Sequence, residues 1–125
     1  MSKQRPVNLD LTTIKFPATA NVSILHRVSG VALVFAVGIL LWILSLSLSS
    51  EQGFKEAQAL LDGTFFKLII LGIETAIIYH FLAGVRHLFM DAGYFEEKAS
   101  GSTSAKVVLV LWVVLTVIAG ICLWQ

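Results

Sequence analysis

Three long apolar stretches constrain the fold of this chain more than any other feature. They cover residues 21–49, 64–90 and 105–125, and each exceeds the roughly 20 residues that a helix needs to cross about 30 Å of hydrocarbon. Apolar residues make up 57% of the 125 residues and charged residues only 14%, which is too little polar surface for a soluble domain of this size. We therefore predict an all-α membrane protein with three transmembrane helices.

The polar segments complete the predicted organisation: an N-terminal segment 1–20, a loop 50–63 and a connector 91–104. Within the loop, the stretch EQGFKEAQALL predicts a short helix lying on the membrane interface. The N-terminal segment lacks the apolar core of a cleaved signal peptide. A net charge of +1 does not favour nucleic acid as a partner, and the single cysteine, Cys122, has no partner for an internal disulfide.

The basic residues predict the orientation in the membrane. Of the nine Lys and Arg residues, seven lie on the side of the N-terminus and the connector, and two lie on the side of the loop 50–63. The seven are Lys3, Arg5, Lys15, Arg27, Arg86, Lys98 and Lys106, and the two are Lys55 and Lys67. By the positive-inside rule, the N-terminal segment and the connector are cytoplasmic, and the loop and the C-terminus lie outside.

The stretch SILHRVSG opens the first apolar segment with polar side chains that hydrocarbon does not favour. On a helix, Ser23, His26, Arg27 and Gly30 lie within an arc of about 100°. Arg27 in this position needs water, protein or an anionic ligand around its charge. Taken alone, these residues are equally compatible with Arg27 snorkelling to the cytoplasmic interface.

The second apolar segment carries a polar stripe in its cytoplasmic half. His80, Gly84, His87 and Asp91 are spaced by four, three and four residues and stay within about 40° of one line along a helix. His80 lies roughly 15 Å from the cytoplasmic end of this segment, which is too deep for easy snorkelling. A histidine in this place can be a hydrogen-bonded structural residue, a proton relay or a metal ligand.

Haem is one ligand that fits this stripe, because its iron commonly binds an imidazole and Gly84 would let a flat molecule approach the backbone. His80 and His87 cannot bind the same iron, because seven residues separate them by about 10 Å along one helix. The second axial ligand would come from another helix, either from His26 or from a different chain.

Two motifs carry a resemblance to a known family. SILHRVSG fits S-x-x-H-R-x-S/T-G, HFLAGVRHLFMDAG fits H-x-x-x-G-x-R-H-x-x-x-D-x-G, and KQRPVNLDLTTIKFP is similar to the N-terminus of the same family. Together they resemble the cytochrome b subunit of succinate dehydrogenase, the larger membrane anchor of enterobacterial-type respiratory complex II. The resemblance covers residues 3–94.

The resemblance implies a six-helix bundle, formed with a second anchor subunit in a bacterial inner membrane. This bundle would hold one haem b and carry the iron–sulfur and flavoprotein subunits on its cytoplasmic side. His80 would be the axial haem ligand from this chain, the other axial ligand would come from the partner anchor, and His26 and Arg27 would lie near the haem propionates. Ser23 and Arg27 would line the ubiquinone site, with Asp91 close to it.

The chemistry of quinone reduction agrees with these implied roles. The carbonyl oxygens of a quinone need hydrogen-bond donors as negative charge develops, and Ser23 can donate while Arg27 supplies a fixed positive charge. Arg27 can also pair with an anionic propionate. The chain has no flavin fingerprint, succinate site or four-cysteine cluster motif, so we expect an electron-transfer subunit that is not an enzyme on its own.

Other functions are also compatible with three apolar helices. The chain could anchor a fumarate reductase, serve as a structural anchor without haem, or form pores as holins do, although a holin would not need the polar stripe. Glu74 belongs to none of these interpretations, because it lies about 120° around the helix from His80. We expect Glu74 to be protonated, bonded to Thr116 or to a partner subunit, or part of a proton path.

Overall fold

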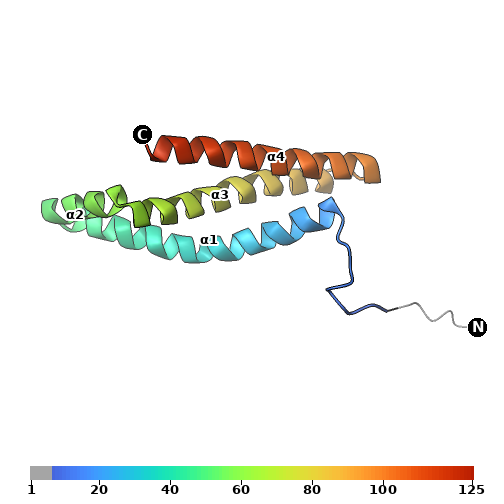
Figure 1. Ribbon diagram of the computed structural model, residues 1–125, viewed down its shortest axis with the longest axis horizontal. Coiled ribbons are helices and arrows are strands. Elements are labelled where there is room, and N and C mark those ends of the chain that lie inside the picture. The colour runs from blue at the N-terminus through green and yellow to red at the C-terminus, as the bar shows by residue number, and fades with distance from the viewer. Residues whose placement is uncertain (1–6) are drawn as a thin grey trace, which may run out of the picture.

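The computed structural model describes residues 7–125, and within them it contains helices and no strands. Four helices follow one another: α1 (Ala18–Ser49), α2 (Glu51–Asp62), α3 (Thr64–Asp91) and α4 (Lys98–Leu123). Helices α1, α3 and α4 run side by side along the length of the molecule, and the short α2 caps one end (Figure 1). At the other end, the start of α1 lies with the end of α3 and the start of α4.

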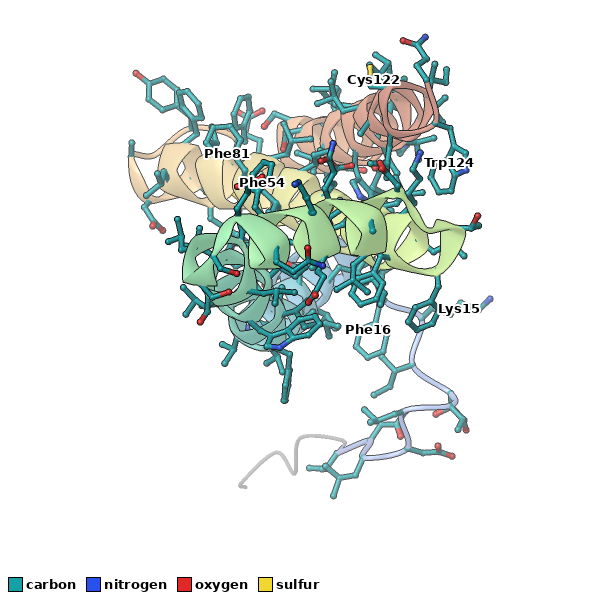
Figure 2. All side chains as sticks on the ribbon, turned by 90° about the vertical axis from the view of Figure 1, so that its left-hand side faces the viewer. Lys15, Phe16, Phe54, Phe81, Cys122 and Trp124 are labelled. Carbon is teal, nitrogen blue, oxygen red and sulfur yellow. The ribbon has the colours of Figure 1, made fainter. Side chains whose placement is uncertain are left out.

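The three long helices are long and apolar enough to cross a membrane. With 32, 28 and 26 residues, they span about 48, 42 and 39 Å at 1.5 Å per residue. Only 11%, 17% and 6% of their most apolar windows is buried inside the chain. Viewed from the α2 end, the side chains of Phe54, Phe81 and Trp124 lie on the outside of the bundle (Figure 2). The prediction of an all-α membrane protein with three candidate spans is confirmed.

Helix α2 confirms the short helix predicted from EQGFKEAQALL. The side chain of Ser50 caps its N-terminus by accepting a hydrogen bond from the backbone N–H of Gly53 at 2.9 Å. Glu51 and Lys55 form an ion pair of 2.7 Å one turn apart, which supports the polar face of this amphipathic helix.

Helix α4 begins at Lys98, seven residues before the start of the apolar segment predicted at 105. The early start has a physical cause, because Gly101 is buried against the rest of the bundle and packing overrides its weak helix propensity. The hydroxyls of Thr103 and Ser104 donate to carbonyl oxygens of the preceding turn, at 3.0 and 2.9 Å. The predicted connector is therefore shortened to the few residues between Asp91 and Lys98.

One cluster joins the three long helices near the end where α1 begins. It consists of Val22 from α1, Tyr79 and Ala83 from α3, and Ala105 and Val108 from α4. The Tyr79 hydroxyl donates to the backbone carbonyl of Val22 at 2.8 Å. This bond holds α3 against α1 one residue before His80, so it sets the position of the candidate site.

Threonines and a tryptophan join α3 to α4 further along the bundle. The indole N–H of Trp112 donates to the carbonyl oxygen and the hydroxyl of Thr75, at 3.1 and 2.9 Å. The Thr75 hydroxyl also bonds the Thr116 hydroxyl at 2.9 Å. The expected hydrogen bond between Thr116 and Glu74 is therefore wrong, because the Thr116 hydroxyl bonds the Thr75 hydroxyl instead. Among the described residues, Glu74 Oε2 is buried without a hydrogen-bond partner.

Candidate functional site

The packing of α1 on α3 brings together the three histidines of the chain. The His26 ring stacks on the His80 ring, with centroids 4.1 Å apart and planes at 13°. His87, two turns further along α3, meets the His26 ring at an angle of 62° and a centroid distance of 5.1 Å. Three members of the polar stripe predicted on α3, His80, Gly84 and His87, therefore face α1 at His26.

Hydrogen bonds fix the orientation and the tautomer of His80. Its Nδ1 lies 3.1 Å from the carbonyl oxygen of His26 and 3.0 Å from Oγ of Ser29. The single hydroxyl proton of Ser29 is donated to that same carbonyl at 2.8 Å, so the Ser29 oxygen accepts from His80. Assigned from this network, Nδ1 of His80 carries the proton and Nε2 carries the free lone pair.

Two glycines allow the imidazoles to approach the facing helix. A Cβ at Gly30 would lie 3.1 Å from Cε1 of His80, and a Cβ at Gly84 would lie 3.3 Å from Nε2 of His26. Both distances are tighter than ordinary van der Waals contact. The space beside Gly84 is thus filled by the imidazole of His26, rather than open to a flat ligand as predicted.

The stacked rings cannot bind one ion between them. An imidazole nitrogen binds a metal along a lone pair in the ring plane, and the planes of His26 and His80 are nearly parallel. Among the described residues, no group of three His, Cys, Asp or Glu side chains is arranged to hold a metal ion. The sequence predicts a second axial ligand from either His26 or another chain. The stacked geometry favours another chain, because His26 and His80 cannot bind the same iron.

Ser23 and Arg27 lie one turn apart on α1, next to the histidine cluster. Ser23 is half-buried and Arg27 is exposed. The described part of the chain offers neither side chain a hydrogen bond or an ion pair. Both are therefore available to a group outside this chain, whether ligand, lipid or partner subunit.

Asp91 is the last residue of α3 and is exposed. Eleven residues separate it from His80, which corresponds to about 16 Å along the helix. Within the described residues it forms no ion pair. The structure thus places Asp91 at the end of the bundle, far from His80 and one turn beyond His87.

The chain matches the family described as "Succinate dehydrogenase/Fumarate reductase transmembrane subunit" over residues 1–119. It belongs to this family. Family membership confirms the resemblance predicted from the two motifs, agrees with a multi-pass membrane protein, and argues against the pore-forming alternative.

Curated members of the family are similar over nearly the full chain. The succinate dehydrogenase cytochrome b556 subunit of Coxiella burnetii is 38% identical over 125 residues, covering 99% of this chain and 100% of the relative. The subunit of the same name from Paracoccus denitrificans is 34% identical over 91% of this chain and 88% of its own length. The succinate dehydrogenase cytochrome b560 subunit of Reclinomonas americana is 33% identical over 97% and 88%.

Ser29 and Arg86 have contacts that the residue pattern does not predict. Ser29 stands in the family motif of α1, but only the structure shows that its oxygen meets His80. The charge distribution predicts that Arg86 belongs to the cytoplasmic flank, whereas in the structure it is buried in α3 with 4% of its surface exposed. Without Arg86 the basic residues still divide six against two, so the predicted orientation keeps its support.

Proposed function

We propose that this chain is the membrane-anchoring subunit of a succinate dehydrogenase that binds haem b and ubiquinone in a bacterial inner membrane. Its partners would be a second anchor subunit completing a six-helix bundle, an iron–sulfur subunit and a flavoprotein subunit, with electrons passing from the iron–sulfur subunit to ubiquinone. The family and the names of the relatives support the assembly. The single observation that carries the haem assignment is the arrangement of His80, whose Nε2 is left with a free lone pair.

The residues present fit a haem. His80 would bind the iron through Nε2, because Ser29 and the His26 carbonyl hold the proton on Nδ1, an arrangement typical of metal-binding histidines. His26 and Arg27 would face the propionates, and the exposed guanidinium of Arg27 can make two parallel hydrogen bonds to a carboxylate. When bound, the haem supplies a site that accepts and releases single electrons.

The quinone site would lie on the neighbouring side of α1. Ser23 would donate a hydrogen bond to a quinone carbonyl, and Arg27 would stabilise the negative charge that develops there. Both side chains are free of partners within the described residues, as a ligand site requires. Asp91 would lie at the border of this site, where protons can enter from water.

Replacing Arg27 by Ala tests the quinone assignment. We expect succinate-to-quinone turnover to fall by roughly 100-fold, because a fixed charge opposite the developing anion is lost. Succinate oxidation with an artificial electron acceptor should stay at the wild-type rate, and the control Lys55→Ala on α2 should change neither. Equal loss of both activities in an assembled Arg27→Ala complex would refute the assignment.

A visible spectrum of the purified complex tests the haem assignment. We expect b-type absorption bands on reduction with dithionite. Their absence would favour the structural anchor without haem. The family description also covers fumarate reductase subunits, but the relatives described above are named for succinate dehydrogenase, and this favours succinate oxidation.

A further inference from the structure

An apolar groove runs between α3 and α4 on a face of α3 that the histidine cluster does not use. Its volume is about 540 Å³. Phe81, Val85 and Phe89 line it from α3, and Val107 and Leu111 line it from α4. Phe81 points outward from the bundle (Figure 2). The groove has the length and polarity of a binding site for an extended apolar chain.

The polar end of this groove holds a buried charge without a counterion. Arg86 is 4% exposed, and its bonds go to neutral acceptors: Nε donates to Ser104 Oγ at 2.9 Å and Nη2 to the Gly101 carbonyl at 3.2 Å. Within residues 7–125, no carboxylate lies within ion-pair distance of it and Nη1 has no hydrogen-bond partner. A buried guanidinium is costly unless an anion neutralises it.

If α3, about 42 Å long, is centred on about 30 Å of hydrocarbon, Arg86 lies near the boundary between headgroups and hydrocarbon. It lies five residues before the end of α3, or about 7 Å along the axis. From Ser100 to Leu111, the groove extends about 16 Å along α4, beginning near the end of the bundle and running toward its middle. A charge at one end and an apolar channel leading deeper are what a phospholipid phosphate and its acyl chain require.

The connector between α3 and α4 closes the polar end of the groove. Phe95 lines it and adopts φ 61°, a left-handed conformation that is unusual for a bulky residue. Its ring lies 6.2 Å from the ring of Phe89, and its carbonyl would be 2.9 Å from a Cβ at Gly101. The backbone is thus held in an uncommon conformation that fits an aromatic ring into the wall beside Arg86.

We propose that this groove binds one phospholipid from the leaflet at the end where α1 begins. Its phosphate accepts hydrogen bonds from Arg86, and one acyl chain lies along Phe81, Val85 and Leu111. A partner helix would cover the apolar wall equally well, but it would need an acidic residue at the depth of Arg86. Every phospholipid carries a phosphate at that depth, which is why the lipid is favoured.

Lipid retention by the intact purified complex tests this proposal. The complex is stripped with detergent, incubated with micelles containing phosphatidylglycerol or diacylglycerol, and analysed by native mass spectrometry. We expect wild type to retain one phosphatidylglycerol and no diacylglycerol, which lacks the phosphate. Arg86→Gln should reduce retention by roughly tenfold, as expected for the loss of a charge-assisted hydrogen bond.

Two further variants keep the test decisive if Arg86→Gln fails to assemble. Val107→Trp fills the groove and keeps Arg86, and it should lose the lipid. Lys106→Gln removes an exposed charge on α4 that does not line the groove, and it should retain the lipid as wild type does. Unchanged phosphatidylglycerol retention in Val107→Trp would overturn the proposal. It would also be overturned if the Val107→Trp complex lost the partner anchor subunit but kept its lipid, because the groove would then bind a helix of that subunit.

The proposal does not depend on the haem or the quinone. A visible spectrum is recorded on each sample, and the lipid-deficient variants should keep the wild-type spectrum because the groove and the histidine cluster lie on different sides of α3. Failure of the haem assignment would appear in wild type as missing bands, whatever its lipid content.

Discussion

Ser29 is the residue that gives the candidate haem ligand its chemistry. It is buried, and it bonds both the His26 carbonyl and Nδ1 of His80. An acceptor on Nδ1–H makes the imidazole a better electron donor through its other nitrogen. Ser29 therefore acts through His80 as a positioning residue.

Replacing Ser29 by Ala should raise the midpoint potential of the bound haem. The His26 carbonyl alone would then accept from Nδ1–H, and a less basic imidazole stabilises the oxidised iron less. We expect a shift of up to about 60 mV, equivalent to a tenfold change for one electron, in a redox titration followed at the b-type bands. Ser23→Ala on the same helix should leave the potential unchanged and slow quinone turnover. A shift in Ser23→Ala and none in Ser29→Ala would reverse the two assigned roles.

At the scale of the helices, Gly30 controls how closely α1 approaches α3. A methyl group at Gly30 would press on His80, whereas nothing lies within 4 Å of a Cβ placed at Gly38 of the same helix. Gly30→Ala and Gly38→Ala both replace glycine by a better helix former, and this alone stabilises the helix by up to about 1 kcal/mol. Comparing the two variants therefore separates the effect of helix propensity from the effect of a contact with the His80 imidazole.

Gly30→Ala should lower the haem content of the purified complex by at least about tenfold, a size typical of disturbed metal-ligand support. Gly38→Ala should keep the wild-type haem content and a melting temperature equal to or above wild type. Haem content is measured by the pyridine haemochrome assay against protein concentration. Equal haem content in the two variants would show that the α1–α3 contact at Gly30 does not shape the site.

The sequence was sufficient to predict that each helix exists and that His80, Gly84 and His87 share one face of the second long helix. Hydropathy and length predict the three long helices, and spacings of three and four place His80 and Ser23 on their faces. Which faces meet cannot be read from one helix at a time. The stacking of His26 on His80 and the burial of Arg86 against α4 depend on packing between segments far apart in the chain. For the same reason, the packing of Gly101 extends α4 beyond its apolar segment.

At the scale of the whole molecule, the chain exposes most of its apolar surface and leaves polar groups without partners. Few residues of the three long helices are buried inside the chain, and Glu74 Oε2 has no partner among the described residues. A single chain of this kind is half of a larger bundle in the proposed assembly. Its remaining contacts would come from lipid and from the second anchor subunit.

The proposed orientation predicts which ends a membrane-impermeant maleimide can reach. In a Cys122→Ala background, Gln125→Cys should be labelled in intact spheroplasts, because the C-terminus would lie outside. Glu97→Cys, in the connector between α3 and α4, should be labelled only after the membrane is opened. Labelling is read as a mass shift on a gel, and the opposite pattern would show that the chain is inserted the other way round.

The most direct test of the account compares two histidines of the same cluster. His80 and His87 both lie near His26, but only His80 has its Nδ1 bonded to Ser29 and to the His26 carbonyl. In reduced spectra of assembled complexes, His80→Ala should lose or shift the b-type bands and His87→Ala should keep them. An unchanged spectrum in an assembled His80→Ala complex would contradict the assignment of His80 as the haem ligand.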